Sequence, residues 1–190
     1  MMVAATSLLA TALVVLVANL TLRLFQNQAH RPSSDVASAS PPASAPLPMS
    51  YQIQRLRQAI IAQESGGDHH LMNASGSGAM GLGQIMPENL PSWSQEVLGR
   101  ELSAQEFLDS PTVQVQIMDH KLAEYWQKAH VQAKGNLDET VMRVAAWWYS
   151  GDPHQFCDTT PQLWNGDRYP SVADYSTSVL GHFNRHQPSI

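Results

Sequence analysis

Glu64 is the residue of this sequence whose position best suits acid–base chemistry. Apolar residues recur at helical spacing across residues 51–64, and Glu64 follows Ile60 by four positions and Leu56 by eight. Because such positions share one face of a helix, we expect Glu64 at the edge of the core. Burial there disfavours the charged form and raises the pKa of the carboxyl. A carboxylic acid that keeps its proton near neutral pH is what a general acid in glycoside cleavage requires. The alternative is a solvated glutamate in the last helical turn.

A second motif, GAMGLGQIMP, covers residues 78–87. Its glycines, Gly78, Gly81 and Gly83, allow the backbone to pass close to a neighbour. It does not predict a phosphate-binding loop, because no Gly-Lys-Ser/Thr follows. Gln84 can both donate and accept hydrogen bonds, which suits sugar hydroxyls and acetamides. Met80 and Met86 are interpreted as core residues rather than ligand contacts.

Together these segments resemble the soluble lytic transglycosylase (SLT) family, which shares a lysozyme-like fold with goose-type lysozyme. The resemblance rests on Glu64-Ser65-Gly66, Ala74-Ser75, Gly78-Ala79-Met80-Gly81-Leu82 and Gln84-Ile85-Met86-Pro87, and continues in AAWWYSG (145–151) and the helix around Tyr175. It covers roughly residues 53–183. Each motif is modest alone, but all of them in this order are specific.

The resemblance implies cleavage of peptidoglycan between N-acetylmuramic acid and N-acetylglucosamine, with 1,6-anhydro ring formation, with Glu64 as general acid and without a cofactor. The residues that match positions bonding the substrate or orienting the acid are Ser65, Ser75 and Gln84. Trp148, Tyr149 and Tyr175 offer flat apolar faces with polar tips, as sugar sites need. For Trp148, core packing is the alternative, because it continues an apolar stripe of its helix.

The sequence departs from the family pattern at three points. Trp148-Tyr149 replaces Tyr-Asn, Gly83 stands where Met is common, and Ser171 stands where many members place a glutamate. The last departure argues against a second carboxylate from the final helix. Asp68 is the remaining nearby acid that could activate water in a hydrolase.

Other candidate residues have weaker signals. The aromatic residues that could line outer subsites are Trp93, Trp164 and Tyr169. Asp68-His69-His70 does not predict a metal site, because adjacent side chains point apart and no third ligand has a useful spacing.

Charge and cysteine content limit the partners. The net charge is −5, and residues 51–190 carry 15 acidic and 9 basic side chains without a basic run. Nucleic acid is therefore not an expected partner. The single cysteine, Cys157, cannot form an intramolecular disulfide.

The elements that position these residues are predicted to be helices, so the fold class is all-α or nearly so. Gly66-Gly67 ends the helix over 51–64. Capping boxes at Ser92/Gln95 and Ser103/Glu106 predict two helix starts. A long helix is predicted to begin at Ser110-Pro111 and to end at Gly135, and the next to begin at Asp138 and to end at Gly151. A polar loop without a strand is predicted over residues 152–170. Ser171 with Asp174 predicts the start of the last helix.

The N-terminal region is predicted to be separate from the catalytic domain over residues 51–190. Residues 1–24 are predicted to form a hydrophobic helix, which is either a membrane anchor or a signal peptide. Arg23 and Arg31 follow the apolar run, and by the positive-inside rule they favour a cytoplasmic location for the chain that follows it. Residues 25–50 form a Pro/Ser/Ala-rich linker. We expect export to the cell envelope, with glycan strands as partner. The alternatives are a muramidase that hydrolyses the same bond and a glycan-binding module without activity.

Overall fold

The computed structural model describes residues 48–185 apart from positions 74–75 and 165. The predicted anchor or signal segment (1–24) and nearly all of the predicted linker (25–50) lie outside the described residues. No helix in the described part of the chain is long and apolar enough to cross a membrane.

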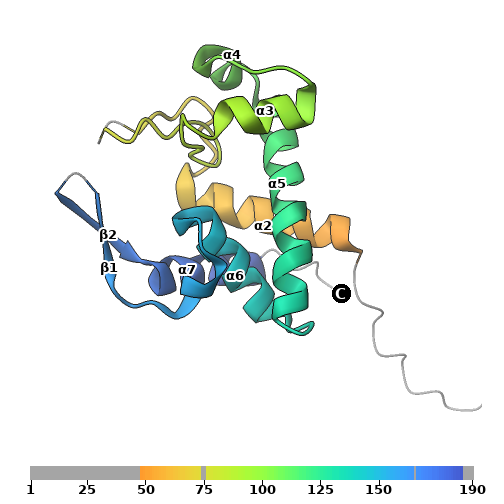
Figure 1. Cartoon of the computed structure of the whole chain (residues 1–190), viewed down its shortest axis with the longest axis vertical. Helices are drawn as coiled ribbons and strands as arrows, with labels where there is room; N and C mark the ends of the chain where they lie inside the picture. Colours follow the sequence, from red (N-terminus) through yellow and green to blue (C-terminus); the bar gives the residue numbers. More distant parts are fainter. Residues whose placement is uncertain (1–47, 74–75, 165, 186–190) are drawn as a thin grey trace, which may run out of the picture. The chain divides into compact units, whose positions relative to one another are not determined.

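Helices make up most of the described chain (Figure 1), which confirms the predicted fold class. The elements are α2 (Met49–Glu64), α3 (Leu90–Leu98), α4 (Ala104–Leu108), α5 (Pro111–Gln132), α6 (Leu137–Ser150), the 3₁₀ turn η1 (Pro153–Cys157), β1 (Pro161–Trp164), β2 (Asp167–Ser171) and α7 (Val172–Arg185).

One hydrophobic core joins these helices. Helix α2 packs against both α5 and α7, and α6 packs against α5 and α7. Residues of the predicted apolar stripes, such as Leu56, Ile60, Leu122, Val144 and Val179, are completely buried. Burial of each such aliphatic side chain stabilises the fold by roughly 1.5–3 kcal/mol. The C-terminal end of α2, with Glu64, is thereby fixed against α7.

Several predicted helix boundaries are confirmed. Ser103 and Glu106 form a reciprocal capping box at the start of α4. At α7, the Ser171 hydroxyl accepts a 3.0 Å hydrogen bond from the Asp174 backbone N–H. Gly151 ends α6 with a φ of 80°, a conformation that glycine adopts without steric cost.

Two predicted caps are wrong. Helix α3 begins at Leu90, so Ser92 lies inside its first turn and is not its cap; the Ser92 hydroxyl donates to the carbonyl of Asn89. Helix α6 is capped by Asn136, whose side chain accepts from the Glu139 N–H, whereas Asp138 lies inside the first turn. Both errors arise because several neighbouring polar residues can act as caps, and tertiary packing selects one of them.

The prediction of a loop without a strand over residues 152–170 is wrong, because this stretch contains a β-hairpin. Strands β1 and β2 pair in antiparallel fashion, with Gln162 opposite Tyr169 and Leu163 opposite Arg168. Gly166, with a φ of 88°, lies in the turn. The strands are short and mostly exposed, so they lack the apolar alternation by which a strand is recognised.

Candidate active site

Glu64 is the last residue of α2 and its carboxylate faces α7. Its Oε1 accepts a 2.5 Å hydrogen bond from the Tyr175 hydroxyl. The side chain is partly buried, and this desolvation raises the pKa of Glu64 to about 7, although the hydrogen bond from Tyr175 acts in the opposite direction. A carboxyl with this pKa is partly protonated at neutral pH, as a general acid must be.

Two stacked tyrosines support this carboxylate. The rings of Tyr149, from α6, and Tyr175, from α7, are 4.3 Å apart and nearly parallel at 8°. The Tyr149 hydroxyl donates to the carbonyl of Pro170 at 3.0 Å, which ties the ring to β2. Burial, with a further contribution from Glu64, raises the pKa of Tyr175 well above its ordinary value. Tyr175 therefore stays a neutral hydrogen-bond donor.

Ser65 connects the end of α2 to the glycine-rich loop. Its hydroxyl donates to the Leu82 carbonyl at 2.8 Å and accepts from the Gly67 N–H at 3.2 Å. These contacts hold the loop against the residue that follows Glu64, so the serine hydroxyl serves the backbone in this structure.

Gln84 lies in the same loop and also bonds the backbone. Its φ of 50° is unusual for a residue with a side chain. The amide nitrogen donates to the carbonyls of Leu71, at 3.2 Å, and Gly81, at 3.1 Å. Both amide hydrogens are thus used to fold the loop, and the amide oxygen is the atom left for a ligand. Ser75, which was also predicted to bind the substrate, lies outside the described residues.

Trp148 and Gly83 form one structural feature. The Trp148 indole Nε1 donates to the Gly83 carbonyl at 3.0 Å. A Cβ at Gly83 would lie 2.8 Å from Cζ2 of Trp148 and 2.9 Å from Cε of Met118. The indole occupies the space that a side chain at position 83 would need, so these two departures from the family pattern belong together.

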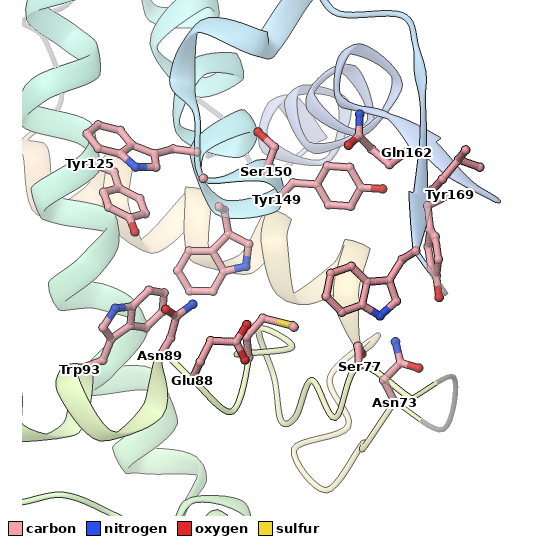
Figure 2. Close-up of a pocket in the computed structure, with 16 residues that line it drawn as sticks. Asn73, Ser77, Glu88, Asn89, Trp93, Tyr125, Tyr149, Ser150, Gln162 and Tyr169 are labelled. Carbon is pink, nitrogen blue, oxygen red and sulfur yellow. The ribbon is translucent and has the colours of Figure 1, made fainter. Parts of the chain in front are cut away.

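A cavity of about 620 Å³ opens beside this feature (Figure 2). Its aromatic lining residues are Trp93, Tyr125, Trp147, Trp148, Tyr149, Trp164 and Tyr169, and its polar ones include Asn73, Ser77, Glu88, Asn89, Ser150 and Gln162. Its volume suits a ligand of a few sugar rings or a few amino-acid residues. Glu64 is not a lining residue; Tyr149 lines the cavity and, through its stacking on Tyr175, connects it to the carboxylate.

Some of the candidate residues line this cavity and others do not. Trp93, Trp164 and Tyr169, predicted for outer subsites, all line it. Sequence reasoning missed Tyr125 and Trp147, whose rings stack at 4.4 Å and 4°. Each of them reads as one more apolar position of a helix, and only the packing of α5 against α6 brings them together.

Ser171 and Asp68, the two residues that bear on a second acid, have structural roles. Ser171 is buried, and its hydroxyl donates to the Asp174 carboxylate at 2.6 Å while capping α7. Asp68 is exposed, and its Oδ1 accepts from the His70 N–H at 2.9 Å, which stabilises the turn after α2. Among the described residues, no three His, Cys, Asp or Glu side chains gather in a way that could hold a metal ion.

Part of the domain is similar to a known family. Residues 49–136 match the family model of the transglycosylase SLT domain, so the resemblance to this family is confirmed over that range. The matched range includes Glu64 and the glycine-rich loop and ends before α6, so Tyr149 and Tyr175 come from the part beyond it.

A solved structure is also similar. It is the X-ray structure of an inactive mutant of the lytic transglycosylase Slt from Pseudomonas aeruginosa, with a TM-score of 0.47 and 22% sequence identity, covering 68% of this chain. The similar region spans 20% of that protein's chain. No curated protein matches this sequence.

Proposed function

We propose that this protein is a peptidoglycan lytic transglycosylase that cleaves the β-1,4 bond between N-acetylmuramic acid and N-acetylglucosamine. The observation that carries the proposal is the position of Glu64, which ends α2 inside the matched SLT domain and accepts a hydrogen bond from the Tyr175 hydroxyl. Burial at this position raises the pKa of Glu64 to about 7. The aromatic cavity next to Tyr149 supports a carbohydrate ligand, since sugar rings pack on aromatic faces.

In the first step, protonated Glu64 donates its proton to the glycosidic oxygen as the bond between that oxygen and muramic acid C1 breaks. The N-acetylglucosamine side leaves as an alcohol, and positive charge develops at C1. The substrate's own acetamide shields this centre.

In the second step, the Glu64 carboxylate removes the proton from the muramic acid C6 hydroxyl. The C6 oxygen then bonds to C1 and closes a 1,6-anhydro ring. Glu64 ends protonated, as it began, and no water is consumed. Tyr175 keeps the carboxylate in one orientation through both steps by its hydrogen bond to Oε1.

This single-acid route agrees with the surroundings of Glu64. Retaining and inverting glycosidases need a second carboxylate about 5–9.5 Å from the first. Ser171, which ends β2 and caps α7, stands where the family resemblance predicts such an acid, and the Asp68 carboxylate stabilises a turn. The alternative, a goose-type lysozyme-like muramidase, requires Asp68 or a loop acid to activate water.

We further propose that the protein acts in the cell envelope, on the glycan strands, with residues 1–24 as its membrane anchor or signal peptide. The length and apolar character of that segment support this proposal.

The substitution Glu64→Gln tests the catalytic role of the carboxyl. Because general acid catalysis contributes typically 10²–10⁴-fold, we expect wall cleavage to fall by at least about 10²-fold. The matched control is Glu101→Gln, which removes one charge from an exposed position. Circular dichroism establishes that both variants are folded. Retained cleavage in Glu64→Gln would contradict the proposal.

A further inference from the structure

Glu88 is the acidic residue among the cavity's lining residues in the described part of the chain, and no Lys, Arg or His lines it. It lies in the turn that precedes α3, beside Asn89. Figure 2 shows the Glu88 side chain directed into the cavity, on the side opposite Tyr149 and Ser150. The cavity therefore combines one carboxylate with aromatic walls.

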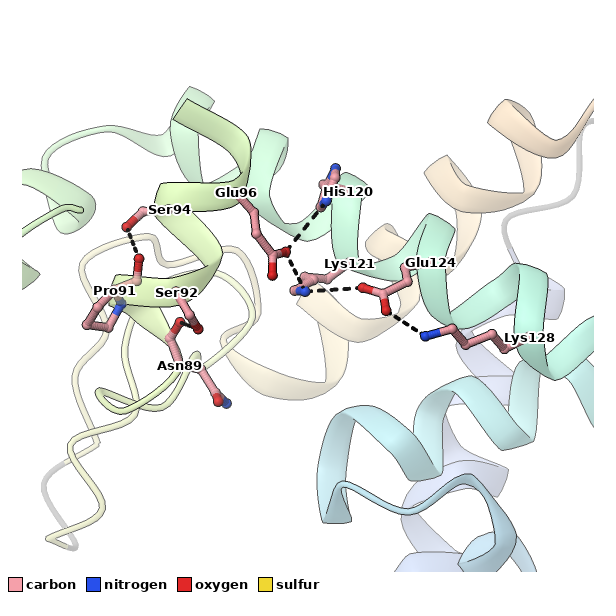
Figure 3. A network of polar contacts seen from close by, with 9 residues as sticks. All are labelled: Asn89, Pro91, Ser92, Ser94, Glu96, His120, Lys121, Glu124 and Lys128. Carbon is pink, nitrogen blue, oxygen red and sulfur yellow. Dashed lines mark hydrogen bonds and ion pairs between the residues drawn. The ribbon is translucent and has the colours of Figure 1, made fainter. Parts of the chain in front are cut away.

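The Glu88 carboxylate has no protein partner among the described residues. Other surface glutamates nearby are paired: Glu96 bonds Lys121 at 2.6 Å, and Glu124 bonds both Lys121 and Lys128. Figure 3 shows this chain of ion pairs along α5. Both lysines are neutralised there and neither lines the cavity, so Glu88 keeps its charge available to a ligand.

Aromatic rings and a carboxylate around one space are the combination that recognises an organic ammonium group. The ring faces attract a cation through their quadrupoles, most strongly for tryptophan. Two of these rings already have cations nearby, since Lys121 lies 5.5 Å from the ring centre of Trp93 and Lys128 lies 5.4 Å from that of Trp147. Among the described residues, no lysine or arginine lies over the rings of Trp148 and Trp164, so these rings can receive a ligand cation.

We propose that Glu88, together with the tryptophans that line the same cavity, binds a primary ammonium group on the substrate's peptide stem. This inference rests on the proposed function, because peptidoglycan glycans carry short peptides that contain a diamino acid. The side-chain ammonium of that residue would bond the Glu88 carboxylate, while the sugar rings lie toward Tyr149 and the catalytic carboxyl.

The proposal is tested by binding of a soluble muropeptide, a disaccharide with a tripeptide that ends in lysine. The full-length protein is titrated with it and with the same compound acetylated on the lysine side chain. Tryptophan fluorescence reports binding, since the cavity is lined by tryptophans. In this disaccharide N-acetylglucosamine is linked to O4 of N-acetylmuramic acid, whose C1 is the free reducing end. The bond at muramic acid C1 that the proposed reaction cuts is therefore absent, and binding is measured without turnover.

We expect the free ammonium to bind roughly 5- to 20-fold more tightly than the acetylated compound, the combined effect of a partly exposed ion pair and a cation–π contact. Glu88→Gln should remove most of that preference, whereas the control Glu101→Gln should keep it. Equal binding of both compounds to the unmodified protein would overturn the proposal. An equal loss for both compounds in Glu88→Gln would also overturn it, because Glu88 would then bond a sugar hydroxyl.

The outcome is independent of the catalytic proposal. If the protein forms 1,6-anhydro products and does not discriminate the ammonium, this inference fails and the proposed function stands. If it binds the ammonium form selectively and cleaves nothing, the proposed reaction fails and the ammonium site stands.

Discussion

The Tyr175 hydroxyl and the Glu64 carboxylate, 111 residues apart in the sequence, are joined by a 2.5 Å hydrogen bond. Burial raises the pKa of Glu64, and this bond lowers it, because a donor stabilises the ionised carboxylate. The result, a pKa of about 7, lets one group give a proton in the first step and take one in the second.

The pH dependence of the reaction should follow Glu64. Since the acid must be protonated in the free enzyme, kcat/KM should fall as pH rises above about 7, by tenfold for each further pH unit. Initial rates of peptidoglycan solubilisation between pH 5 and 9 measure this limb. A rate that stays constant up to pH 9 would exclude Glu64 as the acid.

The stability of Glu64→Gln should depend on pH. The pKa of Glu64 in the folded protein, about 7, lies above its ordinary value of 4.5, so the folded state binds more protons between these values. The free energy of unfolding of the unmodified protein therefore falls as pH rises from about 4.5 to 7. The variant has no carboxyl at position 64 and should not show this fall. At pH 8 the variant should be more stable by about 1–3 kcal/mol, and at pH 4.5 the gain should vanish.

Thermal unfolding of both proteins at the two pH values tests this. If the difference in melting temperature is the same at pH 4.5 and pH 8, then burial does not raise the pKa of Glu64 in the folded state.

The hydroxyl of Tyr175 should determine the pH at which kcat/KM begins to fall on the alkaline side of the pH–rate profile, called the alkaline limb. Tyr175→Phe keeps the ring that stacks on Tyr149 but removes the donor, so the pKa of Glu64 should rise and the limb should move to higher pH. The maximal rate should fall, because the carboxyl loses its fixed orientation. The pH–rate profile of the variant is the measurement.

Tyr149→Phe is the matched control, because its hydroxyl bonds the Pro170 carbonyl instead of Glu64. In Tyr149→Phe the alkaline limb should lie at the same pH as in the unmodified protein. A shift of the same size in both variants would mean that the tyrosines act through packing alone.

Gly83→Ala should destabilise the fold. The added Cβ would meet Cζ2 of Trp148 at 2.8 Å and Cε of Met118 at 2.9 Å, and overpacking of this kind typically costs about 1–3 kcal/mol. Combination with Trp148→Phe should recover part of the loss, since the smaller ring makes room. Urea unfolding of the single and double variants measures the coupling.

Gly181→Ala provides the control for this series. Among the described residues, a Cβ there would meet only Nη1 of Arg185, at an ordinary contact distance of 3.6 Å, and alanine favours the helix. A Gly83→Ala variant as stable as Gly181→Ala would refute the packing of Trp148 on position 83.

The position of Glu64 could be predicted because it depends on local geometry. Ile60 and Leu56 are buried, and a residue four or eight positions later in the same helix must lie on their side. The start of α7 was predictable for the same reason, because Ser171 and Asp174 are close in sequence and form a local cap.

The remaining features of the site depend on contacts between distant segments. The bond from Ser65 to the Leu82 carbonyl and the two bonds of the Gln84 amide form only once the loop is folded. The aromatic wall around Tyr125 and Trp147 requires α5 and α6 to pack together. The β-hairpin was missed because its polar strands pair without burying an apolar face.

The mass of the soluble products tests the central claim most directly. The protein is incubated with purified peptidoglycan and the released muropeptides are analysed by mass spectrometry. We predict muropeptides lighter by one water than hydrolysis products and without a reducing end, because the C6 oxygen closes the ring at C1. Muropeptides with reducing ends would contradict the single-acid mechanism and show a hydrolase. If a folded protein binds the wall and releases nothing, the site is a binding module.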